Sequence, residues 1–447
     1  MQILDKRIYA TWEVQNNSYN FSVIKYNDKN DILVLYKESY NSKKDLLDAE
    51  GKIIDIKAAA KYLNDFCEKY EQSYNGYKLS KISIILPSKN LKICNKYEEI
   101  LIESDVNIPG QVKREQILNL LSLTKQKAVN NDYKIINSKS INWFLDGNLT
   151  NIEGILKLKG HKIGLDSKTY EIDKTVYNTH IQVVKMIGKE ILSFYLNIEA
   201  LYRNIDQDLK KKRSMMIVNW GENSIEAAYF ANGALLDYKY IPQGLASVRV
   251  IIAKILKIKE NIANKYLYNL VDFNSTNIID SNILYKWDSD TKSLKKNTKE
   301  NLKLIIQKQI SEIYNNAKSL QNNKKDQNLI IYNFGEIRKI PGGEALLKKN
   351  ILDNEFVYSE TIMGIRNSIN MEALIGSTRI MDNRNVEKQN RMITSVYTEN
   401  HKTINERLKN QTFINKENYN KDNSENPKLK PLFLLNEGII IDKKETN

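Results

Sequence analysis

Glycine is scarce in this chain, and its distribution excludes one kind of site near the N-terminus. The 447 residues include 17 glycines, against an average usage of about 7%, and the first is Gly51. A loop that cradles phosphates brings several backbone N–H groups close to an anion, which favours glycine. No glycine-dependent loop of this kind lies within the first fifty residues.

Cysteine, histidine and long apolar runs are also rare. Two cysteines, Cys67 and Cys94, form no disulfide framework, and the three histidines His161, His180 and His401 have no metal-ligand spacing. The sequence contains no run of about 18 apolar residues, and its first residues resemble neither a signal peptide nor a membrane span. We therefore expect a cytoplasmic protein in a reducing compartment, without a metal site.

Positive charge is in excess, with a formal net charge of +14. Such a balance suits nucleic acid or an anionic membrane surface. The basic runs Lys210–Arg213 and Lys295-Lys296 are short, however, and no aromatic-interleaved basic motif accompanies them. The pattern favours solvated basic faces and predicts no nucleic-acid partner.

Strands and helices alternate in a pattern typical of an α/β fold. Three short strands within residues 6–39 precede an amphipathic helix at Ile56–Tyr70. Further predicted elements are strands at Lys81–Leu86, Lys168–Val176 and Leu329–Tyr332, helices at Gln111–Lys127, Thr179–Ser193, Thr298–Leu320 and Ile365–Gly376, and a hairpin at Asn277–Trp287.

The stretch Met215–Gly244 predicts three strands, joined by turns at Trp220–Asn223 and Asn232-Gly233. Strand, turn and strand in this order are the layout of a phosphate loop. The first turn has the wrong composition, because a single glycine (Gly221) remains and Asn219 stands where an acidic residue would organise a metal. The stretch indicates a nucleotide-binding fold with a degenerate nucleotide site.

The order and spacing of several segments resemble FtsA, the bacterial cell-division actin homologue, over residues 7–382. The most specific are Phe230–Leu235 (FANGAL) and Tyr240–Gly244 (YIPQG). Five others follow the family in the same order: Gly51–Ala58, Val112–Ile117, Trp143–Gly147, Ile217–Gly221 and Ile252–Lys265. The resemblance implies an actin-like (actin, chaperone and sugar-kinase), two-lobed α/β fold with an α+β insert subdomain of the FtsA type.

This resemblance divides the chain into six parts. Residues 1–80 form the first part of lobe 1, 81–180 the insert, and 181–257 the core of lobe 2. Residues 258–298 form a small partner-binding subdomain, and 299–383 complete lobe 2. Residues 384–447 are rich in Asn, Lys and Glu and are expected to be a disordered tail.

The nucleotide loops depart from the family's pattern. Thr11–Gln15 has no glycine where the family's first phosphate loop has Gly-Thr, and Asn333–Glu336 replaces a run of three glycines and an alanine, with Pro341–Gly343 retained. The residues of the degenerate nucleotide loops are Asn219, Gly221, Glu222, Asn223, Ser224, Glu226, Gly335, Gly342 and Gly343.

These departures argue against nucleotide chemistry. Glu222 would place a carboxylate near the phosphates, which is electrostatically unfavourable, Trp220 narrows the turn, and Glu226 is most simply a solvated strand residue. We expect no catalytic residue, no ATPase activity and no resident cofactor, with Mg-ATP binding as an open alternative. The alternative function is an ATP-binding or ATP-hydrolysing member of the actin and sugar-kinase superfamily.

The tail ends in a candidate docking segment, Leu432, Phe433, Leu434 and Leu435, whose target is a protein or a lipid surface. The resemblance implies an adaptor that links polymers of FtsZ, the tubulin homologue, to the membrane and self-associates into actin-like filaments. It also implies a location at the cytoplasmic face of the inner membrane, at the division site.

Overall fold

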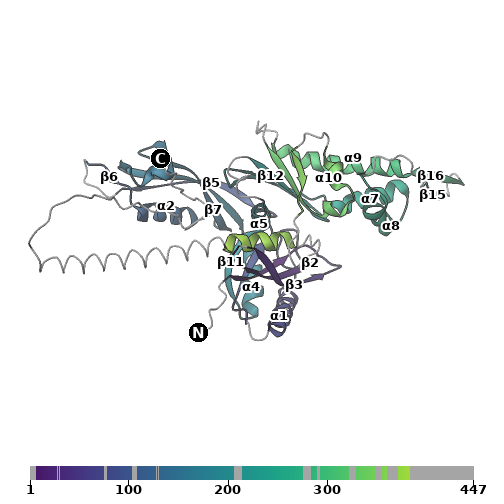
Figure 1. Cartoon of the computed structure of the whole chain (residues 1–447), viewed down its shortest axis with the longest axis horizontal. Helices are drawn as coiled ribbons and strands as arrows, with labels where there is room; N and C mark the ends of the chain where they lie inside the picture. Colours follow the sequence, from purple (N-terminus) through teal and green to yellow (C-terminus); the bar gives the residue numbers. More distant parts are fainter. Residues whose placement is uncertain are drawn as a thin grey trace, which may run out of the picture.

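The structure is a computed structural model, which describes residues 7–27, 29, 31–74, 78–102, 108–126, 128, 130–205, 214–274, 283–288, 292–321, 329–348, 354–359 and 371–382. Three sheets and their helices form two lobes and an insert (Figure 1). The predicted tail from residue 384, with its docking segment Leu432–Leu435, lies outside the described residues.

Lobe 1 is a five-stranded sheet in the order β11-β4-β1-β2-β3. The first three strands form the predicted antiparallel meander, and β4 and β11 add in parallel. The strands are β1 (Ile8–Val14), β2 (Ser18–Tyr26), β3 (Ile32–Asn41), β4 (Lys81–Leu86) and β11 (Glu190–Leu196). Asp55 caps the covering helix α1 (Ile56–Ser73) by accepting the Ala58 N–H at 2.9 Å.

Lobe 2 repeats this topology in the order β14-β13-β12-β17-β18. Again three antiparallel strands are followed by two parallel ones. The strands are β12 (Met215–Trp220), β13 (Ile225–Ala231), β14 (Ala234–Ile241), β17 (Ile330–Gly335) and β18 (Glu355–Val357). Its helices include α7 (Leu245–Leu256), α8 (Glu260–Lys265), α9 (Lys299–Lys318) and α10 (Gly343–Leu347). The repeat places the β1–β2 turn and the β12–β13 turn at equivalent points of the two lobes.

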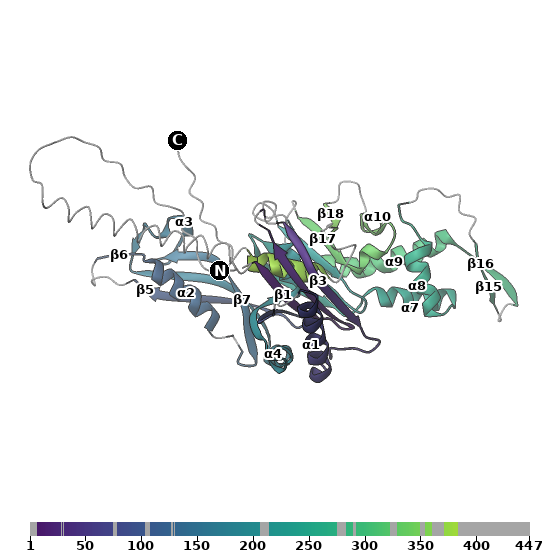
Figure 2. The ribbon, with the colours of Figure 1, turned by 60° about the horizontal axis from the view of Figure 1, so that its bottom comes forward.

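The insert is an α+β unit that extends away from the two lobes, at the opposite end of the molecule from the hairpin β15–β16 (Figure 2). Its sheet has the order β5-β10-β7-β8. Its elements are β5 (Lys92–Leu101), β6 (Gly110–Gln111), α2 (Arg114–Gln126), β7 (Tyr133–Leu145), β8 (Asn148–Thr150), α3 (Ile152–Ile155), β9 (Lys159–Gly160) and β10 (Lys162–Asp173).

The ends of the insert differ from the predicted boundaries at 81 and 180. β4 pairs with β1 and β11 of lobe 1, and α4 (Lys174–Met186) packs beside α1. Five of the six residues of β4 are buried, as expected for a strand inside a partly parallel, covered sheet. Lobe 1 therefore surrounds the insert in sequence, with β4 before it and α4 after it.

Three predicted elements are displaced. The helix predicted at Thr179–Ser193 ends at Met186, because Gly188 adopts a positive φ and β11 starts at Glu190. The hairpin predicted at Asn277–Trp287 is formed instead by β15 (Ile283–Asp288) and β16 (Ser293–Thr298). The last described helix ends at residue 382, beyond the predicted end at Gly376, and residues 365–370 of the helix predicted at Ile365–Gly376 lie outside the described residues. None of the described helices combines the length and apolar character needed to cross a membrane.

The helix at 372–382 returns the chain to lobe 1. It contributes Leu374, Ile375 and Met381 to the core of that lobe, and Asp382 accepts the Arg7 guanidinium at 2.5 Å. Gly376 touches α5 (Asn197–Arg203), the helix that leads from β11 toward lobe 2: a Cβ on Gly376 would lie 1.8 Å from the Ala200 carbonyl oxygen. This contact requires glycine because the backbones of the two helices meet here and leave no room for a side chain.

We predict that Gly376→Ala lowers the free energy of unfolding by at least about 2 kcal/mol, since the added methyl group overpacks a contact between two backbones. Chemical denaturation measures this change. Gly154→Ala in α3 is the matched control, because a Cβ there meets nothing within 4 Å. A Gly376→Ala protein as stable as the control would contradict the described packing.

Candidate functional site

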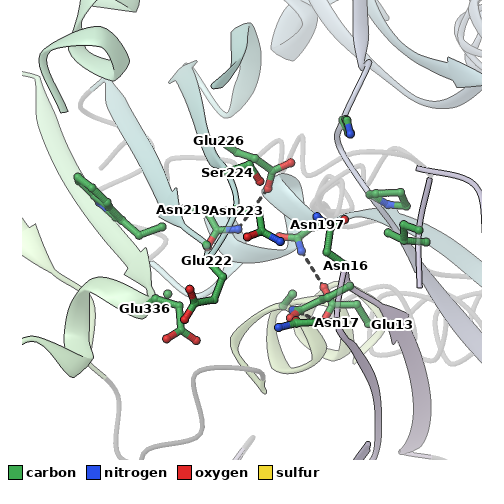
Figure 3. A pocket seen from close by; sticks show the side chains of 18 of the residues that line it. Glu13, Asn16, Asn17, Asn197, Asn219, Glu222, Asn223, Ser224, Glu226 and Glu336 are labelled. Atoms are coloured by element: carbon green, nitrogen blue, oxygen red, sulfur yellow. Dashed lines mark hydrogen bonds between the residues drawn. The ribbon is translucent and has the colours of Figure 1, made fainter. Parts of the chain in front are cut away.

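A cleft of about 420 Å³ separates the two lobes. The β1–β2 turn and α5 line it from one side, and the β12–β13 turn and the end of β17 from the other (Figure 3). Of the sequence-predicted residues, Asn219, Gly221, Glu222, Asn223, Ser224, Glu226 and Gly335 line the cleft. Asn16 and Asn17, which the sequence analysis did not single out, face them from lobe 1.

Gly342 and Gly343, the other two predicted residues, are not part of the cleft lining. A Cβ on Gly342 would lie 2.4 Å from the Asn274 amide nitrogen, and one on Gly343 would lie 2.5 Å from the Ile337 carbonyl oxygen. These glycines allow close approach of backbone segments within lobe 2. This close packing accounts for glycine at both positions, and no ligand needs to be invoked.

The two turns that face each other close in the same way. The Gln15 N–H donates to the Ser18 carbonyl, and the Gly221 N–H to the Ser224 carbonyl, both at 2.9 Å. No residue of 13–18 or 219–226 has a positive φ. A backbone anion nest alternates right- and left-handed conformations so that successive N–H groups converge. Neither turn has that geometry.

The N-terminus of α7 is occupied by the second turn. The N–H groups of Leu245 and Ala246 donate to the Gly221 and Glu222 carbonyls at 3.2 and 2.8 Å. A Cβ on Gly244 would lie 2.3 Å from the Glu222 carbonyl oxygen, so the helix start and the turn are in direct contact. The N–H groups with which a helix start commonly binds phosphate are therefore used within the protein.

Glu13, at the end of β1, is the most deeply buried carboxyl of the cleft, with 1% of its surface exposed. Its pKa is raised to about 8, mainly by burial and to a smaller extent by the nearby Glu226 carboxylate, against the hydrogen bonds that lower it. Those bonds come from the Asn197 amide at 2.7 Å and the Gln15 amide at 3.0 Å. Sequence reasoning missed Glu13, because its segment was examined only for the glycine that it lacks.

Glu226 lies on the lobe 2 side of the same cleft and is not the solvated strand residue that we predicted. Its carboxylate accepts the Tyr238 hydroxyl at 2.8 Å and the Asn219 amide at 3.2 Å. Burial raises its pKa, and these two hydrogen bonds oppose the rise. The Asn219 amide thus donates to the Glu226 carboxylate. In the pattern of the family that the sequence resembles, an acidic residue that organises a metal stands at the position of Asn219.

The charged side chains that line the cleft are mostly glutamates. Five glutamates line it, against two lysines: Glu13, Glu222, Glu226, Glu336, Glu372, Lys89 and Lys339. Glu222 turns to Arg249 of α7, with 2.5 Å between Oε2 and Nη1. Glu336 pairs with Lys339, and Lys89 lies over the Tyr240 ring. An incoming polyphosphate would meet carboxylates that already hold the nearby cations.

An aromatic residue seals the side of the cleft beneath the β12–β13 turn. Trp220 is 1% exposed, and its indole N–H donates to the Asn333 side-chain oxygen at 2.9 Å. The Asn333 amide in turn donates to the Tyr314 hydroxyl and the Phe356 carbonyl, both at 3.3 Å. Asn333 occupies a position where the family pattern has glycine. A buried polar network therefore fixes the indole in place.

Taken together, these residues do not fit a magnesium nucleotide. The turns offer no convergent N–H groups, the start of α7 is occupied, and carboxylates predominate. Within the described part of the chain, no three carboxyl, thiol or imidazole groups lie close enough to hold a metal ion. Instead, the polar side chains of the cleft bind other groups of the same protein.

We predict that Glu13 makes stability depend on pH. Its pKa of about 8 in the folded protein exceeds the ordinary 4.5, so the stability that the protonated carboxyl provides is lost as the pH rises from 4.5 to 8. Glu13→Gln should match the wild type at about pH 4 and exceed it by on the order of a few kcal/mol at about pH 8.5. Denaturant unfolding at both pH values tests this, with Glu190→Gln as an exposed control. Parallel pH profiles for wild type and Glu13→Gln would refute it.

Comparison with known proteins identifies no relative from sequence: no family model matches the chain, and no curated protein matches it. Solved structures do match. The type IV pilus biogenesis complex PilM–PilN aligns with a TM-score of 0.50 and 9% identity, covering 78% of this chain and 87% of the other.

Two more solved structures align over most of the chain. The MreB 5 protein of Spiroplasma citri bound to AMPPNP has a TM-score of 0.48 and 11% identity, with 86% and 99% of the two chains covered. The ethanolamine utilization protein EutJ from Carboxydothermus hydrogenoformans has a TM-score of 0.46 and 12% identity, with 83% and 89% covered. The alignment with PilM–PilN and the duplicated lobes show that the chain has the actin-like ATPase fold, which confirms the predicted fold.

Proposed function

We propose that this protein is an actin-like adaptor of the FtsA kind, which has kept the fold as a scaffold and does not hydrolyse ATP. In this role it links FtsZ polymers to the cytoplasmic face of the membrane at the division site and self-associates. The observation that carries the proposal is the interlobe cleft, in which carboxylates, asparagines and a buried tryptophan stand at the nucleotide position of the fold.

The contacts across the cleft support a scaffold role. Glu372, at the start of the 372–382 helix of lobe 1, accepts the Arg338 guanidinium and the Gly335 N–H of lobe 2. Glu372 is buried, and a buried, hydrogen-bonded ion pair is costly to break because it leaves an uncompensated charge. This pair joins the lobes without a nucleotide between them. The enzyme alternative would instead need groups that bind phosphates and metal at the same point.

The insert supports the FtsA-like assignment. It lies between β4 and α4 of lobe 1, and the resemblance to FtsA implies a family-specific subdomain in this part of the chain. An adaptor binds several partners at once, and the insert adds a surface without disturbing either lobe.

We predict that Mg-ATP leaves the melting temperature unchanged. A ligand present at 100 times its Kd would stabilise the folded state by about 2.7 kcal/mol, which is a shift of several degrees for a domain of ordinary size. Differential scanning fluorimetry with and without about 1 mM Mg-ATP measures it, alongside phosphate release. A shift of that size together with measurable hydrolysis would favour the enzyme alternative.

We further predict that the protein co-sediments with FtsZ polymers and floats with liposomes of anionic phospholipid. A chain ending at Asp382 should keep the first property and lose the second, because the apolar segment Leu432–Leu435 lies beyond that residue. Failure of both forms to bind FtsZ would exclude the division role. Since the PilM–PilN structure is a pilus biogenesis complex of the same fold, an assembly-system partner would then be the next candidate.

A further inference from the structure

Among the described residues, a helix covers one face of the insert sheet. α2 lies on one side of this sheet (Figure 1) and packs its apolar residues against alternate residues of the strands. The cluster consists mainly of Ile117, Leu120, Leu121, Trp143, Ile163 and Leu165. Because successive side chains of a strand point to opposite faces, the residues between these belong to the other face.

Large side chains on that other face remain open to solvent. Gly164 of β10 lies opposite Glu99 of β5 and Phe144 of β7, and Phe144 lies opposite Leu149 of β8. Tyr97 and Leu101 share the face with Glu99 by the two-residue period. The exposed fractions are 77% for Leu101, 70% for Leu149 and 50% for Tyr97. We call Tyr97, Leu101, Phe144 and Leu149 the insert platform.

The platform is built rather than incidental. A Cβ on Gly164 would lie 2.3 Å from the Tyr97 hydroxyl oxygen, so the glycine gives the tyrosine ring room to lie against the sheet. The ring packs edge-on against Phe144, with 6.0 Å between centroids, and its hydroxyl donates to Glu99 at 2.8 Å. An apolar patch with a polar rim on an otherwise solvated unit is typical of a binding surface.

We propose that the insert platform binds the C-terminal apolar segment of the same chain, Leu432–Leu435. The platform presents four large side chains, and the segment supplies four consecutive apolar ones, alternate members of which face the platform when the segment is extended. From Tyr97 to Leu101 a strand advances roughly 14 Å, and an extended backbone from Leu432 to Leu435 advances roughly 10 Å, so the segment fits within the length of the platform. Lys428 and Lys430 precede the segment, and Asp166, on the same face beside Tyr97, carries the opposite charge, as does Glu99, which is paired with Lys162 at 3.2 Å.

The chain is long enough to make this contact within one molecule. The described helix ends at Asp382, next to Met381, whose sulfur contacts Ser83 of β4 at 2.9 Å. Eighteen residues separate Ser83 from Leu101, so the platform is at most roughly 65 Å away. The 50 residues from Asp382 to Leu432 span up to roughly 165 Å when extended. Tethering also gives the segment a high effective concentration at the platform.

In the free protein, the apolar segment of the tail is then bound to the insert of the same chain. A membrane or another partner must compete with the insert for this segment. The proposed contact does not depend on whether the cleft binds a nucleotide. It also differs from the FtsZ-linking role, because it concerns the isolated chain in the absence of lipid and of any polymer.

Photo-cross-linking in the full chain tests the contact. A benzophenone amino acid replaces Leu149, and the matched control places it at Leu304 on α9, which is 58% exposed. We expect the Leu149 probe to label peptides containing residues 428–441 in the monomer fraction, with a yield that is unchanged on dilution. The double variant Leu432→Asp/Phe433→Asp should reduce this yield about tenfold or more, because charges replace two buried apolar side chains.

Two outcomes would overturn the proposal. If the probe at Leu149 labels the tail no more strongly than the probe at Leu304, the segment does not bind the platform. Cross-links between two chains that vanish on dilution would mean that the platform binds a second copy instead. The tail substitutions lie outside the described fold, and an unchanged melting temperature confirms that any loss of labelling is not a loss of folding.

Discussion

The contact between α5 and the 372–382 helix is the constraint on which the arrangement of this molecule depends. These two segments carry the chain between lobes, and Gly376 lets their backbones touch at Ala200. Glu372 then extends from the start of the second helix to Arg338 and Gly335 of lobe 2. The 372–382 helix thus packs its apolar face into lobe 1 and binds lobe 2 through Glu372. These two sets of contacts set the width of the cleft.

The cleft shows how a nucleotide fold can satisfy its polar groups internally. Buried polar groups must be hydrogen-bonded, and here asparagine amides and a tyrosine hydroxyl serve the Glu13 and Glu226 carboxyls. The turn carbonyls accept the first N–H groups of α7. Three glutamates of the cleft, Glu222, Glu336 and Glu372, are paired with cations of the chain itself.

In our interpretation, one face of the insert sheet stabilises the unit and the other face binds a partner segment. One face holds α2 and gives the unit its own small core. The opposite face carries an aromatic and aliphatic surface that adds nothing to that core. A unit that is stable through one face is free to vary the other, which suits the part of an adaptor that recognises apolar segments.

The sequence alone determined the class of elements and much of their order. The meander before residue 40, the amphipathic helix from Ile56 and the strand–turn–strand around Gly221 follow from local patterns of period and turn residues, and the structure has all three. The β1–β2 turn of lobe 1, which contains no glycine, has no residue with a positive φ in the structure. Boundaries were less certain: Gly188 ended a helix that the apolar pattern would have continued.

The tertiary structure decided which side chains meet. Glu13 and Glu226 are more than 200 positions apart, and only the repeated topology of the two sheets brings their carboxyls to one cleft. Trp220 and Asn333 meet because β12 and β17 are parallel neighbours, whereas the sequence showed only a tryptophan beside a turn and an asparagine in place of glycine. Period and capping act over a few residues and are legible in the chain itself. Burial, charge pairing and the sharing of one cleft act across the fold, so only the assembled structure could assign them.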